Sequence, residues 1–129
     1  MGSSFIRLKE KFLEELSPDS HFEVLFDHLP GVSFFAKNRD FKIVSANRAF
    51  WERLGCKSEA DLIGKHDFEL FPNELARKFR DDDETVINSG EPMLKIVELF
   101  FNRQGLPDWY FTNKFPVFGK DQSIIGVMG

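Results

Sequence analysis

The stretch that decides the fold is FFAKNRDFKIVSANRAFWERLG, residues 34–55. Apolar and β-branched residues lie on both sides of Asn38-Arg39-Asp40, a tripeptide with the chemistry of a turn. Asn47 then precedes a run with helical character, where its side chain can cap the first turn. The stretch therefore predicts a β-hairpin that leads directly into a short helix.

Further segments extend this pattern toward the C-terminus. A single capped turn is expected between Ser58 and Gly64, and a long helix begins at Pro72-Asn73 and ends at Ser89-Gly90. Strands are expected at residues 32–36, 41–46, 93–101, 109–118 and 123–128. Helices followed by a run of strands are typical of the α+β class, in which an antiparallel sheet is covered on one face.

The N-terminal segment has a different pattern. Phe5, Leu8, Phe12 and Leu16 form one narrow apolar stripe on a predicted helix, which is typical of a helix-pairing seam. Ser17-Pro18-Asp19 interrupts it, and a second short helix is expected from a capping box at residues 20–23. We therefore divide the chain into an amphipathic helix at residues 1–19, which could form a dimer, and a globular domain at residues 20–129.

Composition limits the class of protein. The 129 residues include 16 Phe, are 42% hydrophobic and carry a net charge of −4, without a basic cluster for nucleic acid. A single cysteine excludes an internal disulfide, and neither a signal peptide nor an apolar run of about 18 residues is found. We expect one cytoplasmic domain with an aromatic interior and no direct contact with nucleic acid or membrane.

Four segments together resemble a PAS domain. They are FFAKNRDFKIVSANRAFWERLG, DLIGKHDFELFP, DDDETVINSGEP and DWYFTNKFPVFGKDQSIIGVMG, at residues 34–55, 61–72, 81–92 and 108–129. The resemblance implies a five-stranded antiparallel sheet with a helical insert between the second and third strands. It also implies a sensory role, with a small molecule between helices and sheet. The variant is most similar to modules of bacterial AraC- or LuxR-type transcription regulators or histidine kinases, so an effector is expected beyond Gly129.

The resemblance raises two possible cofactors. Flavin-binding light sensors of this family use a cysteine within Asn-Cys-Arg-Phe, which is absent here, so Cys56 is interpreted as a small structural residue. Haem-binding members commonly use a histidine of the long helix, and residues 74–88 contain none. His21, His28 and His66 are interpreted as surface or hydrogen-bonding residues. The identity of any cofactor stays open.

The acidic run Asp81-Asp82-Asp83-Glu84 has two interpretations. It could be a solvated helix face, or Asp82 or Asp83 could turn toward the strands and pair with Arg48 or Lys114, since a buried carboxylate needs a partner. No metal-ligand spacing, phosphate-binding loop or nucleophile motif accompanies the run. We therefore do not expect an enzyme.

A pocket between sheet and helices is the remaining candidate site. The residues expected to line it are Phe34, Ile43, Ser45, Phe50, Phe68, Phe71, Leu75, Phe79, Val86, Ile96, Phe111 and Asn113. The Phe rings could fill this space themselves, or they could leave room for an apolar or aromatic ligand oriented by Asn113. The first alternative predicts a ligand-free dimerisation module, and the second predicts a sensor that passes ligand binding to an effector.

Overall fold

The computed structural model describes residues 2–17, 22–101 and 104–129. Its elements are α1 (Gly2–Glu15), η2 (Phe22–His28), β1 (Phe35–Asn38), β2 (Ile43–Ala46), α2 (Arg48–Arg53), η3 (Glu59–Asp61), α3 (Asp67–Leu70), α4 (Asn73–Ser89), β3 (Met93–Phe101), β4 (Pro107–Phe118) and β5 (Ile124–Met128). The α+β class and the five-stranded sheet with helices between β2 and β3 are confirmed.

The sheet has the strand order β2-β1-β5-β4-β3, and every neighbouring pair is antiparallel. β5 therefore lies in the centre of the sheet and joins the N-terminal hairpin to the C-terminal one. Gly126 of β5 makes this possible, because a Cβ atom there would collide with the backbone oxygen of Lys37. The two strands can approach this closely only without a side chain.

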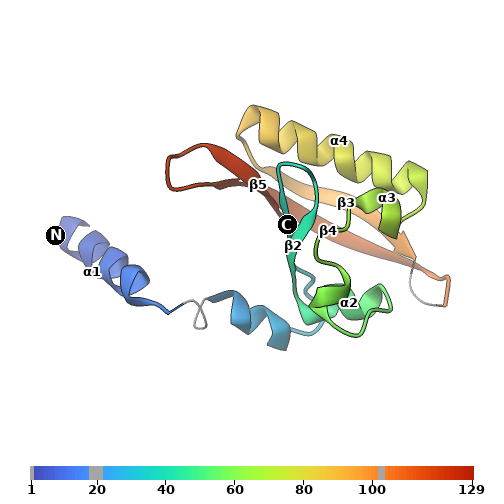
Figure 1. Cartoon of the computed structure of the whole chain (residues 1–129), viewed down its shortest axis with the longest axis horizontal. Helices are drawn as coiled ribbons and strands as arrows, with labels where there is room; N and C mark the ends of the chain where they lie inside the picture. Colours follow the sequence, from blue (N-terminus) through green and yellow to red (C-terminus); the bar gives the residue numbers. More distant parts are fainter. Residues whose placement is uncertain (1, 18–21, 102–103) are drawn as a thin grey trace.

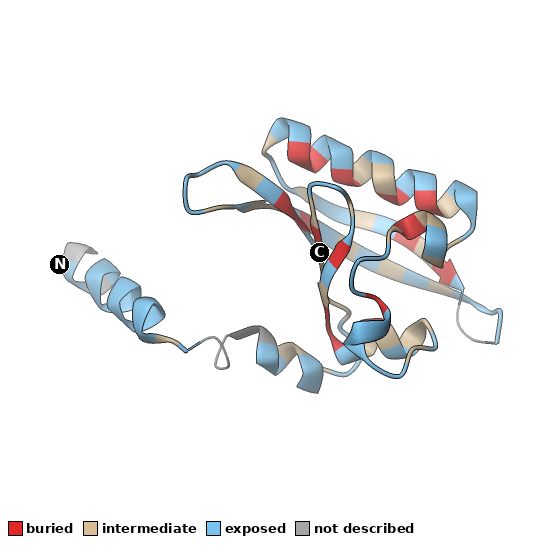
Figure 2. Cartoon of the chain, viewed as in Figure 1, coloured by how far each residue is buried: buried red, intermediate tan, exposed pale blue. Residues whose placement is uncertain are grey.

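The helices between β2 and β3 cover one face of the sheet, with α4 lying across it (Figure 1). The residues that α4 turns toward the sheet are buried, while its opposite side is exposed (Figure 2). Two apolar clusters anchor this layer. One contains Ile43, Phe50 and Leu62, and the other joins Val86 of α4 to Val127 of β5.

Asn47 connects the start of the domain to the hairpin and to α2. Its Oδ1 atom accepts hydrogen bonds from the backbone N–H groups of Phe34, at 2.9 Å, and Phe50, at 3.1 Å. Its Nδ2 atom donates to the carbonyl oxygens of Phe26, at 2.9 Å, and Val32, at 2.8 Å. The predicted cap of α2 is confirmed, and the same side chain also holds residues 32–34 beside it.

The first strand begins later than the sequence predicts. The expectation of residues 32–36 is wrong at both ends, because β1 runs from Phe35 to Asn38. Residues 32 and 34 instead bond to Asn47, and Lys37 and Asn38 pair with β5. The turn after β1 is as predicted, since the Asn38 side chain accepts hydrogen bonds from the N–H groups of Asp40 and Lys42.

Helix α1 stands apart from the sheet (Figure 1). Leu8 and Phe12 of the predicted stripe are both more than half exposed, whereas Leu16 is half-buried. Two residues of the predicted break at Ser17-Pro18-Asp19 and two of the predicted capping box at residues 20–23 lie outside the described residues. Across the described ranges, no helix has the length and apolar character needed to cross a membrane.

We expect the Asn47→Asp variant to fold with a clearly lower free energy of unfolding. The carboxylate keeps the two accepted hydrogen bonds but cannot donate to the carbonyl oxygens of Phe26 and Val32. An unsatisfied buried group costs roughly 1–3 kcal/mol. Urea denaturation measures the difference.

The control is Asn73→Asp, an exposed position at the start of α4. There the same substitution removes no buried hydrogen bond. Equal losses in the two variants would contradict the role assigned to Asn47.

Candidate functional site

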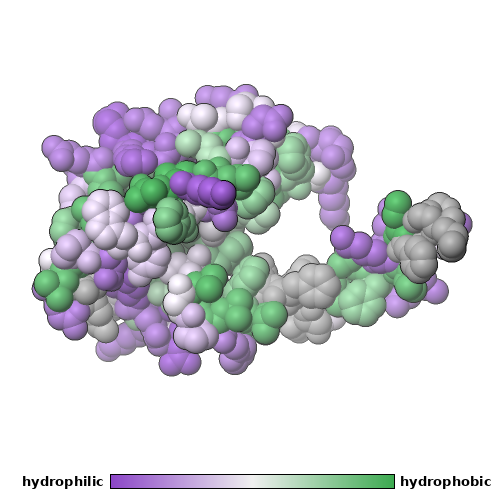
Figure 3. All heavy atoms as spheres, turned by 180° about the vertical axis from the view of Figure 1, so that it is seen from behind, coloured by the Kyte–Doolittle hydropathy of each residue, from purple (hydrophilic) through white to green (hydrophobic). Residues whose placement is uncertain are grey.

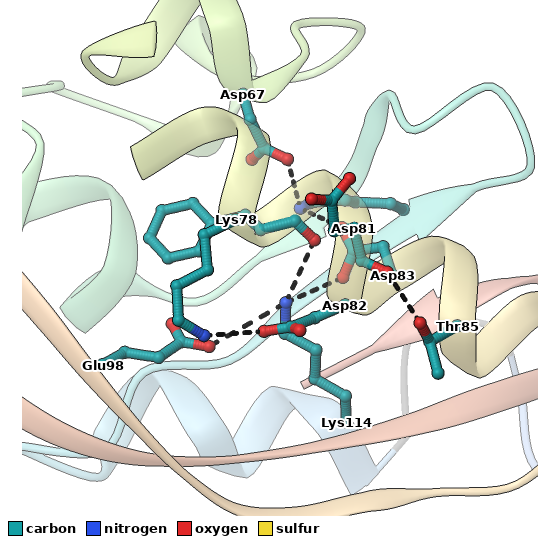
Figure 4. Close-up of polar contacts among 10 residues, drawn as sticks. Asp67, Lys78, Asp81, Asp82, Asp83, Thr85, Glu98 and Lys114 are labelled. Carbon is teal, nitrogen blue, oxygen red and sulfur yellow. Dashed lines mark hydrogen bonds and ion pairs between the residues drawn. The ribbon is translucent and has the colours of Figure 1, made fainter. Parts of the chain in front are cut away.

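A cluster of charged side chains is buried between the helices and the sheet (Figure 4). Lys37 comes from β1, Asp67 from α3, Asp83 from α4, Glu98 from β3 and Lys114 from β4. None of these side chains is more than 3% exposed. Buried charges are rare unless they are paired, so the geometry of their contacts decides what this cluster does.

Asp83 lies between the two lysines. One carboxylate oxygen accepts from Lys37 Nζ at 2.6 Å, and the other accepts from Lys114 Nζ at 2.9 Å. Lys37 also donates to Asp67 at 2.8 Å. Burial lowers the pKa of Lys37, but the charges of Asp83 and Asp67 outweigh this effect and raise it overall, so the lysine stays charged. These contacts tie α3 and α4 to β1 and β4.

The prediction that Asp82 or Asp83 pairs with Arg48 or Lys114 is confirmed for Asp83 with Lys114. Arg48 pairs instead with Glu52 in its own helix. Asp82 bonds to Lys78 at 3.1 Å near the surface. The acidic run is therefore partly a solvated face and partly a buried ion pair.

Glu98 is the fifth member of the cluster, and it is not fully paired. Its Oε1 atom lies 3.9 Å from Lys114 Nζ, beyond hydrogen-bonding distance, and it has no hydrogen-bond partner among the described residues. The two lysines are already matched by the two aspartates. Burial raises the pKa of Glu98, although the positive charge of Lys114 opposes the shift.

Glu98 also faces a pocket beside the cluster. The pocket has a volume of about 610 Å³ and is bounded by residues 31–35, the end of α2, β3, β4 and the end of β5. Its walls are largely aromatic, with Phe34, Phe50, Phe100 and Tyr110 among them. A volume of this size is typical of small-molecule sites.

The aromatic rings of the wall support one another. Phe100 contacts Phe79 at 5.2 Å and Tyr110 at 5.3 Å between ring centroids. Phe26 and Phe34 contact each other at 5.0 Å. Next to the pocket the rings are packed more tightly, and a space of only about 20 Å³ remains between Phe71, Phe79 and the charged cluster. The rings therefore fill the interior around the charged cluster and leave the neighbouring pocket open.

The structure divides the predicted pocket residues into three groups. Those beside the pocket are Phe34, Phe50, Phe111 and Asn113. Phe71 and Phe79 line the small space next to the pocket, and Phe50 lines both spaces. Those that line neither space are Ile43, Ser45, Phe68, Leu75, Val86 and Ile96.

The last group has separate structural roles. Ile43 and Val86 are fully buried in the two apolar clusters. Phe68 packs against the guanidinium group of Arg80, with the cation 5.3 Å from the ring centroid. The prediction that these six residues line the pocket is therefore wrong.

Phe111 lines the pocket as predicted but only at its rim, because the residue is 81% exposed. The inward residues of β4 are Tyr110, Thr112 and Lys114, since successive side chains of a strand point to opposite faces. Asn113 is also on the outer side, where its Oδ1 atom accepts the backbone N–H of Lys95 at 2.9 Å.

Sequence reasoning missed Arg53, Glu98, Phe100 and Tyr110 as pocket residues. A buried glutamate carries no local signal in a strand that looks apolar. The alternation along β3 is a signal that could have identified Glu98, because Ile96, Glu98 and Phe100 alternate with residues that are more exposed.

Cys56 and His66 lie outside the pocket. Cys56 packs beside the apolar cluster of Ile43 and Leu62, in agreement with its interpretation as a small structural residue. His66 Nε2 lies 2.9 Å from Glu69 at the partly exposed start of α3. His28 is exposed on η2, and His21 is outside the described residues.

Comparisons with known proteins agree on one fold. A family model described as "PAS fold" matches residues 26–129. The Vibrio cholerae VqmA dimer, a LuxR-type receptor solved in the absence of target DNA, is 28% identical with a TM-score of 0.74, over 88% of this chain and 50% of that one. VqmA bound to DPO is 30% identical with a TM-score of 0.72, over 81% and 52% of the two chains.

A curated relative, the uncharacterized protein y4lL of Sinorhizobium fredii, is 29% identical over 83 residues. The match covers 64% of this chain and 10% of y4lL. The chain thus spans about half of VqmA and a tenth of y4lL.

We expect the Glu98→Gln variant to gain stability relative to the wild type as the pH rises. Because burial raises the pKa of Glu98 above its ordinary value of 4.5, the folded protein keeps a proton that the unfolded chain has released. Wild-type stability therefore falls between 4.5 and the folded pKa, whereas the amide cannot ionise. Urea denaturation at several pH values across this window measures the difference.

Glu74→Gln, at an exposed position of α4, is the matched control. A Glu98→Gln difference that stays constant with pH would contradict the assignment.

Proposed function

The chain belongs to the PAS family, and on that premise we propose that it is a non-catalytic sensory module that binds a small organic molecule between its helices and sheet. The observation that carries the proposal is the open aromatic pocket beside the buried charged cluster. PAS domains are generally sensory rather than catalytic. A relative bound to a compound, VqmA with DPO, supports small-molecule binding in this part of the family.

The relay of the signal is proposed to run through β5. Gly129, after the end of β5, exchanges two backbone hydrogen bonds of 3.0 Å with Phe35, and both residues line the pocket. A ligand that changes the position of the Phe35 ring would therefore act on the end of the central strand. A coupling free energy of about 1–3 kcal/mol between ligand and strand position is sufficient for signalling.

The output is proposed to be transcription regulation through an effector domain of a longer parent protein. VqmA is described as a LuxR-type receptor that binds DNA, and the chain spans about half of it. A histidine kinase is the other effector that we consider. We place the module in the cytoplasm, because a single cysteine is typical of reducing compartments.

A ligand-free interaction module is the second candidate function. It is favoured by the closed packing next to the pocket and by exposed apolar residues on the outer sheet face, among them Val97, Trp109 and Phe111. Figure 3 views the molecule from behind, and green apolar side chains lie on this face as well as along α1. In this alternative, the pocket is a packing defect and no ligand is retained.

Dimerisation is part of both candidate functions. The proposed contact is the apolar stripe of α1 against the same stripe of a second copy. Leu8 and Phe12 are exposed on a helix that stands apart, and pairing would bury them. The VqmA relative is described as a dimer.

We expect the Thr112→Trp variant to lose small-molecule binding and keep its fold. Thr112 lines the pocket from β4 and is half-buried, so a larger ring enters the open volume rather than the packed core. The neutral fluorescent probe N-phenyl-1-naphthylamine should bind the wild type and bind the variant at least about tenfold more weakly. Circular dichroism checks the fold.

Native mass spectrometry of the unrefolded protein complements this measurement. A retained mass that disappears in Thr112→Trp supports the sensor. Equal probe binding by both proteins, with no retained mass in either, would favour the ligand-free module.

We expect the double variant Leu8→Ser/Phe12→Ser to be monomeric at concentrations where the wild type is dimeric. The substitutions remove the apolar side chains of the stripe and leave the globular domain unchanged. Sedimentation equilibrium measures the oligomeric state. The control Arg7→Ser/Glu14→Ser changes the opposite side of α1 and should remain dimeric, and a wild-type monomer would refute this contact.

A further inference from the structure

Two ionisable side chains in the pocket have polar atoms that the fold does not use. Arg53, the last residue of α2, and Glu98 of β3 both line the pocket. The Nε and Nη1 atoms of Arg53 and the Oε1 atom of Glu98 are buried and have no hydrogen-bond partner among the described residues. Buried polar atoms without partners are uncommon, and the two residues that carry them line the same pocket.

Arg53 is held in place by aromatic rings rather than by an anion. Its guanidinium carbon lies 4.4 Å from the ring centroid of Phe100 and 4.2 Å from that of Tyr110. These cation–π contacts orient the group but leave its Nε and Nη1 atoms without a hydrogen-bond partner among the described residues. By contrast, Arg48 at the other end of α2 pairs with Glu52. A guanidinium group presents two parallel donors that match a carboxylate.

Glu98 supplies the complementary charge near the same rings. It is the cross-strand neighbour of Tyr110 in the pairing of β3 with β4. Lys114 is 3.9 Å away and already bound to Asp83, while Lys78 and Asp82 of α4 act on Glu98 from a greater distance. The Oε1 atom of Glu98 therefore has an acceptor position that no described residue fills, and Glu98 itself lines the pocket.

We propose that Arg53 and Glu98 bind the carboxylate and the ammonium group of a single amino-acid-type ligand, whose apolar side chain packs against the aromatic wall. A zwitterion supplies a partner for both orphaned groups and adds no net charge to the pocket. A simple carboxylate satisfies Arg53 but leaves Glu98 unpaired, and a simple amine does the reverse. The inference rests on the proposed function, because it assigns a ligand class to the same pocket.

Three compounds with the same phenyl ring test the assignment. L-phenylalanine carries both charged groups, 3-phenylpropanoate lacks the ammonium group, and 2-phenylethylamine lacks the carboxylate. Each is titrated against wild-type protein carrying N-phenyl-1-naphthylamine, and displacement gives the affinity. L-phenylalanine is expected to bind at least about tenfold more tightly than the other two, since each lost charge-assisted hydrogen bond weakens binding.

Variants assign each group to its partner. Arg53→Met should reduce the affinity for L-phenylalanine and 3-phenylpropanoate about tenfold and leave 2-phenylethylamine unchanged. Glu98→Gln should weaken L-phenylalanine and 2-phenylethylamine and leave 3-phenylpropanoate unchanged. Arg48→Met, at the exposed end of the same helix, is the matched control and should change none of the three.

The outcomes separate this inference from the proposed function. If the naphthylamine probe binds but L-phenylalanine displaces it no better than the two simpler compounds, the amino-acid assignment is overturned and the pocket remains. The same holds if Arg53→Met and Glu98→Gln weaken all three compounds equally. If the probe itself fails to bind and no mass is retained on the protein, the small-molecule function fails together with this inference.

Discussion

The buried carboxylate of Asp83, held between Lys37 and Lys114, is the contact on which the arrangement of this domain depends. The three residues come from α4, β1 and β4, which are far apart in the sequence. A buried charge without its partner is strongly unfavourable, so the helix and the two strands are stable together only in the register that brings the three groups into contact. Asp67 extends the same requirement to α3.

This constraint also determines where open space remains. The ionic cluster and the rings of Phe71 and Phe79 fill the region beneath α4, and little volume is left there. The pocket lies beside this region, where Phe34, Phe50 and the end of β5 form the wall. Glu98 belongs to both parts, because its carboxylate lies near Lys114 and also faces the pocket. A ligand at Glu98 would thus be close to the contacts that hold the helices to the sheet.

Predictions from the sequence were correct where a single residue determines the local backbone structure. Asn47 caps α2, and α4 ends at Ser89-Gly90, both as predicted. The sequence did not indicate which residues of β4 face the interior, because Trp109, Tyr110 and Phe111 place aromatic rings on both faces of the strand. Tyr110 and Thr112 face inward together with Lys114, and a lysine is seldom expected in a core.

The sequence by itself determined the order of elements, the turns and caps between them and the family resemblance, because these depend on residues close together in the chain. Only the tertiary structure decided that Asp83 rather than Asp82 is buried, that Phe111 points outward, and that Arg53 and Glu98 share one pocket. Each of these outcomes depends on which distant residue lies opposite in space. Hydrophobic periodicity describes only the element itself, so it cannot supply the partner that makes a buried charge acceptable.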